Sequence, residues 1–179
     1  IAGSDKTINY DTNEYTVVID VEDNGKGQMV AKVNGEAYDG GVVATITNHN
    51  PENTDLEVDF VKKVLNGRDM KAGEFKCKLS VKEKPEGVDA KEEWNQVGSN
   101  VAANDGAQAR VEFEKLPFDV AGTYVFEVTE ESGDLGGVTY STEKHQVTVT
   151  IVNVDNALEV LSVVIDEQSD AEEIEFVNT

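Results

Sequence analysis

The sequence predicts an all-β sandwich that belongs to a tandem repeat. Alternating apolar residues and closely spaced turn signals predict the sandwich, and an internal repeat predicts the tandem arrangement. Apolar and polar residues alternate in residues 15–21, 124–128 and 146–151, as they do in strands that bury one face. Many short strands separated by tight turns are typical of two packed antiparallel sheets. Asn, Asp and Gly residues that favour such turns lie between the apolar stretches, at residues 23–25, 66–67, 104–106 and 136–137.

One segment, residues 88–97, resembles a helix, but Pro85, Gly87 and Gly98 bracket it too closely for a helix to extend. Trp94 lies inside this segment, where we expect a partly buried loop anchor rather than an exposed contact residue. We therefore expect strands and loops throughout the 179 residues, which are enough to bury a substantial core.

The chain repeats itself with one constant offset. Residues 10–21 correspond to residues 140–151, and residues 46–48 correspond to residues 176–178. The offset is 130 at both ends (140 − 10 and 178 − 48), so the two copies align without a gap. A repeat that keeps its register over this length indicates a tandem module.

The repeat predicts the domain organisation. We assign residues 56–179 to one complete module and residues 1–49 to the closing strands of a preceding repeat. Residues 50–55 form a short polar linker between them, and its Pro51 limits the angles that the two parts can adopt.

Acidic residues dominate the composition, with 36 Asp and Glu against 15 Lys and Arg and a formal net charge of −21. Such a chain repels phosphates and anionic lipid headgroups, so we expect neither nucleic acid nor a membrane as a partner. No apolar run is long enough to cross a bilayer. The sequence opens without a signal peptide, at Ile1, and resembles the cut edge of a longer polypeptide.

The single cysteine, Cys77, cannot form a disulfide within the chain. It lies in an alternating stretch, where we expect a small buried residue on a strand rather than a nucleophile. A secreted β protein without disulfides needs another means of stabilisation.

We expect no metal and no cofactor. Residues 20–25 begin like a calcium-binding loop, but Ala31 stands at the twelfth position, where a bidentate Glu is required. A hairpin turn is the better interpretation of this segment. The two histidines, His49 and His145, do not have metal-ligand spacing.

Three polar residues extend apolar stripes that strand periodicity directs inward. Lys63 lies between Val61 and Leu65, while Glu130 and Asn178 each end an alternating apolar run. An unpartnered buried charge is costly, so these three residues should meet, or else they are ordinary polar residues in water at strand ends.

If the three residues meet in an apolar pocket, that pocket favours the uncharged amine and the uncharged carboxylic acid. The neutral amine of Lys63 is then a nucleophile, and Glu130 can donate a hydrogen bond to the side-chain carbonyl of Asn178 and move protons. Attack on the amide carbon would release ammonia and leave an isopeptide bond, once per molecule. The nucleophile is Lys63 by its spacing, and Lys62 is the alternative if a bulge shifts the register toward Phe60.

Several stretches resemble the streptococcal pilin isopeptide-linkage domain, the FctA-like family. Residues 61–75 are similar to its opening, residues 118–130 to the strand with its catalytic Glu, and residues 137–140 and 176–179 to its closing segments. The resemblance spans residues 50–179, and residues 1–49 resemble its last part. It implies an immunoglobulin-like sandwich of the Cna-B type, with Lys63 as nucleophile, Asn178 as acceptor and Glu130 as catalyst. Cys77 departs from the family pattern, which has a larger apolar residue there.

The resemblance predicts a structural stalk or spacer module of a Gram-positive adhesin or pilus, on the cell surface and anchored to the wall. We expect neighbouring repeats of the same protein as partners and no enzymatic turnover beyond the single crosslinking event. The alternative is an adhesive module that binds a host protein or glycan through loops such as residues 83–103.

Asn48 is the repeat equivalent of Asn178, but residues 1–49 hold no equivalent of Lys63 or Glu130. We therefore expect Asn48 to be unbonded unless a second molecule supplies partners. Strand exchange between chains through residues 1–49 is one route, and an artefact of where the polypeptide was cut is another.

Overall fold

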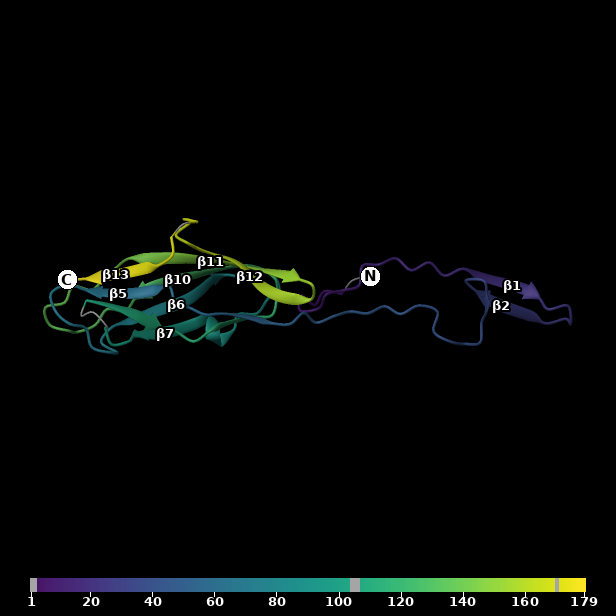
Figure 1. Cartoon of the computed structure of the whole chain (residues 1–179), viewed down its shortest axis with the longest axis horizontal. Helices are drawn as coiled ribbons and strands as arrows, with labels where there is room; N and C mark the ends of the chain where they lie inside the picture. The colour runs from purple at the N-terminus through teal and green to yellow at the C-terminus, as the bar shows by residue number, and fades with distance from the viewer. Residues whose placement is uncertain (1–2, 104–106, 170) are drawn as a thin grey trace. The chain divides into compact units, whose positions relative to one another are not determined.

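The computed structural model describes residues 3–103, 107–169 and 171–179 and divides into two compact units between Asn50 and Pro51 (Figure 1). The first two residues, with which the expected cut edge begins, and the turn expected at residues 104–106 lie outside the described residues. Within the described part, no helix is long and apolar enough to span a membrane.

The first unit contains a small antiparallel sheet in the order β1 (Ile19–Asp23), β2 (Met29–Val33) and β3 (Glu36–Ala37). The predicted hairpin turn after residue 22 is confirmed, with Gly25 in the left-handed region at φ 74°. The strand predicted from residue 15 is wrong at its start, because sheet pairing begins only at Ile19, opposite Val33.

The second unit is built on one large sheet that curls around its main hydrophobic core, so the predicted all-β, immunoglobulin-like sandwich is confirmed. Its neighbours are antiparallel except for the last pair, β5 and β13, which run parallel. A small second sheet pairs β4 (Thr54–Leu56), which takes up the last two residues of the expected linker, with β9 (Leu116–Phe118). The order in the large sheet is β12 (Ala157–Ile165), β11 (Lys144–Val154), β10 (Gly122–Glu130), β6 (Lys76–Glu83), β7 (Asn95–Asn100), β8 (Gln108–Glu112), β5 (Val61–Leu65) and β13 (Ile174–Asn178).

Aromatic residues fill the core at the end of the sandwich formed by β9 and β10. Trp94 is fully buried, stacks on Phe118 and donates from its indole nitrogen to the Pro117 carbonyl at 2.9 Å. We expected a partly buried loop anchor, and the structure buries the residue completely. The helical turn around it is a short 3₁₀ segment, Glu92–Trp94.

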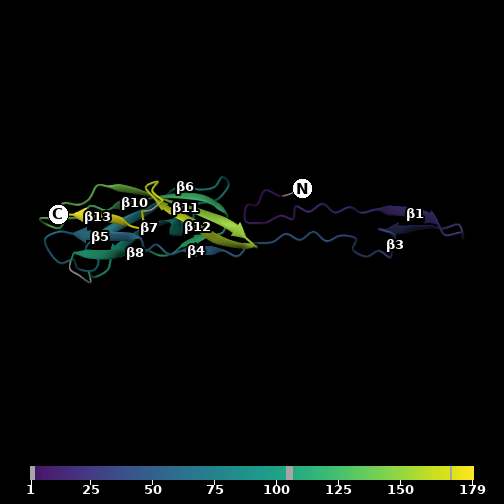
Figure 2. The ribbon, with the colours of Figure 1, turned by 45° about the horizontal axis from the view of Figure 1, so that its top comes forward.

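The parallel pair of β5 and β13 sets the inward-facing residues of both strands side by side (Figure 2). Lys63 lies opposite Phe176, and Leu65 lies opposite Asn178. In β13 the residues alternate between buried and exposed positions, as the sequence pattern predicted. Lys63 and Asn178 therefore stand diagonally across the same face of the sheet.

Candidate functional site

Lys63, Glu130 and Asn178 meet inside the sandwich. The Lys63 ammonium Nζ lies 2.9 Å from the Glu130 Oε1 oxygen, and the side chains of both are completely buried. The Asn178 side-chain nitrogen, Nδ2, donates a hydrogen bond to the same Oε1 oxygen at 3.0 Å. One carboxylate oxygen therefore contacts both the amine and the nitrogen that would leave as ammonia.

The surroundings of Lys63 are mostly apolar. Its Nζ donates to the Phe176 carbonyl oxygen at 2.8 Å and lies 5.2 Å from the centre of the Phe75 ring. Burial lowers the pKa of the Lys63 amine below its ordinary value, and the ion pair with Glu130 opposes this shift only in part. The site thus favours the uncharged amine, which is the nucleophilic form.

The lowered pKa predicts how stability depends on pH in a chain that keeps Lys63 free, such as Asn178→Ala. Between the folded pKa and the ordinary value of 10.5, the unfolded state binds more protons, so the free energy of unfolding should rise with pH. The slope should reach at most about 1.4 kcal/mol per pH unit. Denaturant unfolding of Asn178→Ala across this range measures the slope, which should disappear when Lys63→Met is added. An equal slope in both variants would contradict the prediction.

Cys77 neighbours the site without taking part in its chemistry. It is fully buried on β6, as predicted for a strand residue. Burial first, and then the Glu130 carboxylate, raises the pKa of its thiol to about 12. The thiol therefore stays protonated and is a poor nucleophile.

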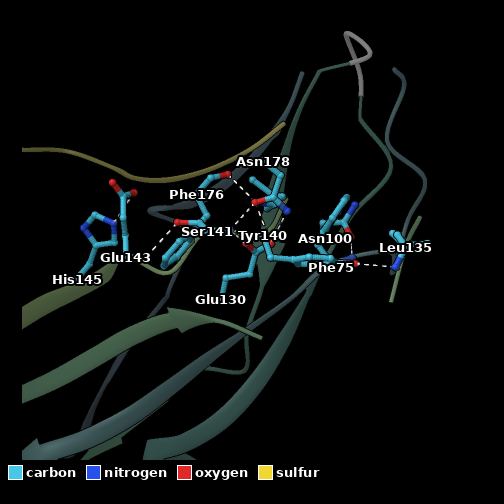
Figure 3. A network of polar contacts seen from close by, with 11 residues as sticks. Phe75, Asn100, Glu130, Leu135, Tyr140, Ser141, Glu143, His145, Phe176 and Asn178 are labelled. Carbon is cyan, nitrogen blue, oxygen red and sulfur yellow. Dashed lines mark hydrogen bonds and ion pairs between the residues drawn. The ribbon is translucent and has the colours of Figure 1, made fainter. Parts of the chain in front are cut away.

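A backbone donor holds the Asn178 carbonyl. The Ser141 N–H donates to Asn178 Oδ1 at 2.9 Å and also to Glu130 Oε2 at 2.8 Å, as Figure 3 shows. We expected Glu130 to polarise this carbonyl, but in the structure Asn178 Oδ1 accepts its hydrogen bond from Ser141. Sequence reasoning missed Ser141 because a backbone N–H carries no signature of residue type.

The segment before Ser141 is fixed from both sides. Thr139 and Thr179 exchange backbone hydrogen bonds of 2.7 and 3.3 Å, and the Tyr140 ring packs against Phe75 with 5.7 Å between centres. Gly133 lies against Tyr140 so closely that an added Cβ would stand 2.5 Å from the Tyr140 oxygen. This contact leaves room only for glycine unless the ring moves.

Gly133→Ala should therefore slow the crosslinking chemistry, because a displaced Tyr140 ring shifts the Ser141 N–H away from the Asn178 carbonyl. Forced overpacking of this kind costs on the order of 1–3 kcal/mol, so we expect a crosslinking rate several-fold lower. Intact-mass time courses after cell-free synthesis measure this rate. Gly136→Ala, where an added Cβ meets nothing within 4 Å, is the matched control. Equal rates for the two variants would count against the role given to Ser141.

The neighbouring lysine lies elsewhere. Lys62 is about a third exposed, with 32 % of its side chain accessible, and forms an ion pair with Glu173. It faces away from the buried group, and β5 and β13 pair in continuous register without a bulge. The geometry thus brings Lys63, not Lys62, to Glu130 and Asn178. Asn48, in the first unit, is exposed.

Comparison with protein families gives a match to FctA, described as the Spy0128-like isopeptide containing domain, over residues 2–54 and 60–179. The matched residues include the buried Lys, Glu and Asn of the second unit and Asn48 of the first. No curated protein matches the chain.

Proposed function

Because the chain belongs to the FctA family of Spy0128-like isopeptide-containing domains, a family of structural pilin modules, we propose that its second unit is a stalk module locked by an isopeptide bond between Lys63 and Asn178. The observation that carries this proposal is the position of one buried oxygen, Glu130 Oε1, in contact with both Lys63 Nζ and Asn178 Nδ2.

Glu130 is placed to move protons in both directions. It takes a proton from the Lys63 ammonium across the 2.9 Å contact, which leaves a neutral amine. The amine attacks the Asn178 amide carbon, Glu130 passes its proton across the 3.0 Å contact to the departing nitrogen, and the carboxylate then takes the second proton that Nζ must lose. The C–N bond to Nδ2 breaks, the bond to Nζ forms, and one ammonia leaves.

Ser141 supports this step electrostatically. In the tetrahedral intermediate negative charge develops on Asn178 Oδ1, the atom that already accepts the Ser141 N–H at 2.9 Å. A backbone donor that is held in place before the reaction needs no reorganisation during it. Because the reacting groups belong to one folded chain, attack is intramolecular and its entropic cost is small.

The bond would join β5 to β13, which are the first and the last strands of the large sheet in chain order. It would close a loop of 115 residues (178 − 63), and an amide resists reduction. These properties suit a semi-rigid spacer on a Gram-positive cell surface, anchored to the wall and continued by neighbouring repeats. The alternative, adhesion through residues 83–103, gains no support from Trp94, because its ring is fully buried.

Intact mass spectrometry tests the proposal. The purified chain should be lighter than its sequence by one ammonia, and proteolysis should yield a branched peptide that joins Lys63 to Asn178. A mass equal to that of the plain sequence would contradict it, as would a branch at Lys62.

A further inference from the structure

A third buried amide or charged residue lies near the reacting group. In the part of the chain that the structure describes, Lys63, Asn100 and Asn178 are the residues of this kind that are buried as a whole. Lys63 and Asn178 take part in the proposed chemistry, whereas Asn100, at the end of β7, has no part in it. A buried amide loses its contacts with water, so its hydrogen-bond partners show what it holds in place.

Asn100 holds one short loop, residues 71–75. Its Oδ1 oxygen accepts the Phe75 N–H at 2.9 Å, and its own N–H donates to the Phe75 carbonyl at 3.1 Å. Its Nδ2 donates to the Lys71 carbonyl at 2.8 Å and to the Val101 carbonyl at 3.0 Å. The backbone of Phe75 is thus fixed on both sides, and both polar atoms of the Asn100 side chain have partners.

The Phe75 ring contacts both halves of the reacting group, as Figure 3 shows in part. The residue is 1 % exposed, and the centre of its ring lies 5.2 Å from Lys63 Nζ. The ring also packs against Tyr140, with 5.7 Å between centres. Tyr140 precedes Ser141, whose N–H donates to the Asn178 carbonyl. The ring therefore keeps water from the amine and supports the backbone donor that holds the amide.

We propose that Asn100 is a positioning residue for the crosslinking reaction and that it acts through Phe75. By fixing the backbone of Phe75, the Asn100 side chain keeps the ring over Lys63 Nζ and against Tyr140. This inference rests on the proposed function of the second unit. The effect is indirect, because the ring, and not the Asn100 amide, contacts the reacting amine.

Asparagine suits this position because its amide offers an acceptor and two donors in one plane. Here they match one N–H and two carbonyls of the surrounding backbone. Alanine would leave these three buried groups without their partner, which is costly. Residues 71–75 would then shift to regain hydrogen bonds, and the Phe75 ring would move with them.

Intact-mass time courses after cell-free synthesis measure the effect on the reaction. Asn100→Ala should slow the loss of ammonia by roughly 10- to 100-fold, because a misplacement of about 1 Å in a supporting group is enough for such a loss. Asn95→Ala is the matched control, since Asn95 is the same residue type at an exposed position of the same strand. It should crosslink like the unaltered chain.

The titration of Lys63 separates positioning from a merely structural role. Asn178→Ala keeps the amine free, and NMR of a chain labelled in its lysine side chains follows the titration. Burial is the main cause that lowers the pKa of Lys63, and Glu130 on β10 and Cys77 on β6 also act on it. Adding Asn100→Ala should let water reach the amine, so the titration should move to higher pH, toward the ordinary value of 10.5.

A destabilising substitution far from the site is the control for this titration. Ile151 is buried and pairs with Gly122, at the opposite end of β10 from Glu130. In the Asn178→Ala chain, Ile151→Ala should make the second unit unfold more readily and leave the Lys63 titration where it was.

A double variant tests the route through the ring. Phe75→Leu alone should slow crosslinking, because it removes the ring over Lys63 Nζ. Adding Asn100→Ala to Phe75→Leu should slow the reaction little further, since the group that Asn100 positions is already gone. Independent effects of the two substitutions would multiply instead.

Trp94 emission shows whether each variant folds, because this residue is buried in the second unit. If Asn100→Ala does not fold, Asn100→Asp is the milder variant: it keeps an acceptor for the Phe75 N–H, loses the donors to the Lys71 and Val101 carbonyls, and should also crosslink more slowly. Failure of both variants to fold would assign Asn100 to the fold alone and overturn the inference.

The remaining outcomes distinguish the two proposals. An unchanged rate in Asn100→Ala, an unmoved Lys63 titration or multiplying effects in the double variant would overturn this inference and leave the proposed function standing. An unaltered chain that loses no ammonia would overturn the proposed function, and this inference with it.

Discussion

Glu130→Gln is expected to leave the chain at the full mass of its own sequence, without the loss of one ammonia that crosslinking causes. A Gln side chain keeps the shape of the site, but it cannot take a proton from Lys63 Nζ or return one to Asn178 Nδ2. General acid–base catalysis of this kind is worth roughly 10²- to 10⁴-fold in rate.

The control is a second glutamate on the same strand. Glu127 also lies on β10, in an ion pair with Lys82 at 2.9 Å on the partly exposed face. Glu127→Gln should crosslink like the unaltered chain, as should Lys62→Ala. A Glu130→Gln chain that still lost ammonia at normal speed would show that another group moves the protons.

Asn178→Ala is expected to lower the thermal midpoint of the second unit by roughly 15–20 °C. The missing crosslink closes a loop of 115 residues, and the chain-entropy estimate for such a loop is about 5 kcal/mol. The lost hydrogen bond from the Ser141 N–H to the Asn178 carbonyl adds to this figure, because that carbonyl survives crosslinking.

Fluorescence measures this change selectively. Trp94 is the only tryptophan and is fully buried in the second unit, so its emission reports the unfolding of that unit. Comparison with Glu130→Gln separates the bond from its surroundings, since both variants lack the crosslink but lose different contacts. Val177→Ala, at an exposed position on β13, is the matched control and should unfold close to the unaltered chain. A midpoint for Asn178→Ala equal to that of this control would contradict the prediction.

Much of this fold could be predicted because strand periodicity is local information. The alternation around Lys63 and Asn178 identified their inward faces, and the constant offset of 130 tied the first unit to the end of the second. The structure adds that β5 and β13 are parallel neighbours, a pairing across more than 100 residues that periodicity does not encode.

Other features could not be predicted, for physical reasons. The Ser141 N–H depends on where a loop passes over the end of β13, and any residue type could supply it. The strand expected from residue 15 starts only at Ile19, because alternation reports a suitable pattern and not the presence of a partner strand. Strand β4 was missed inside the expected linker because three residues are too few for a periodic signal.

The parallel pairing of β5 and β13 also determines how the module would meet a pulling force. The end at which the chain enters β5 and the end at which it leaves β13 lie at opposite ends of their shared hydrogen-bond ladder. Tension applied between these two ends would therefore shear all the hydrogen bonds of the ladder at once instead of breaking them one after another. An amide between Lys63 and Asn178 would join the same two strands near the C-terminal end of β13. A covalent bond would then resist a tension that otherwise only the hydrogen bonds between the strands oppose.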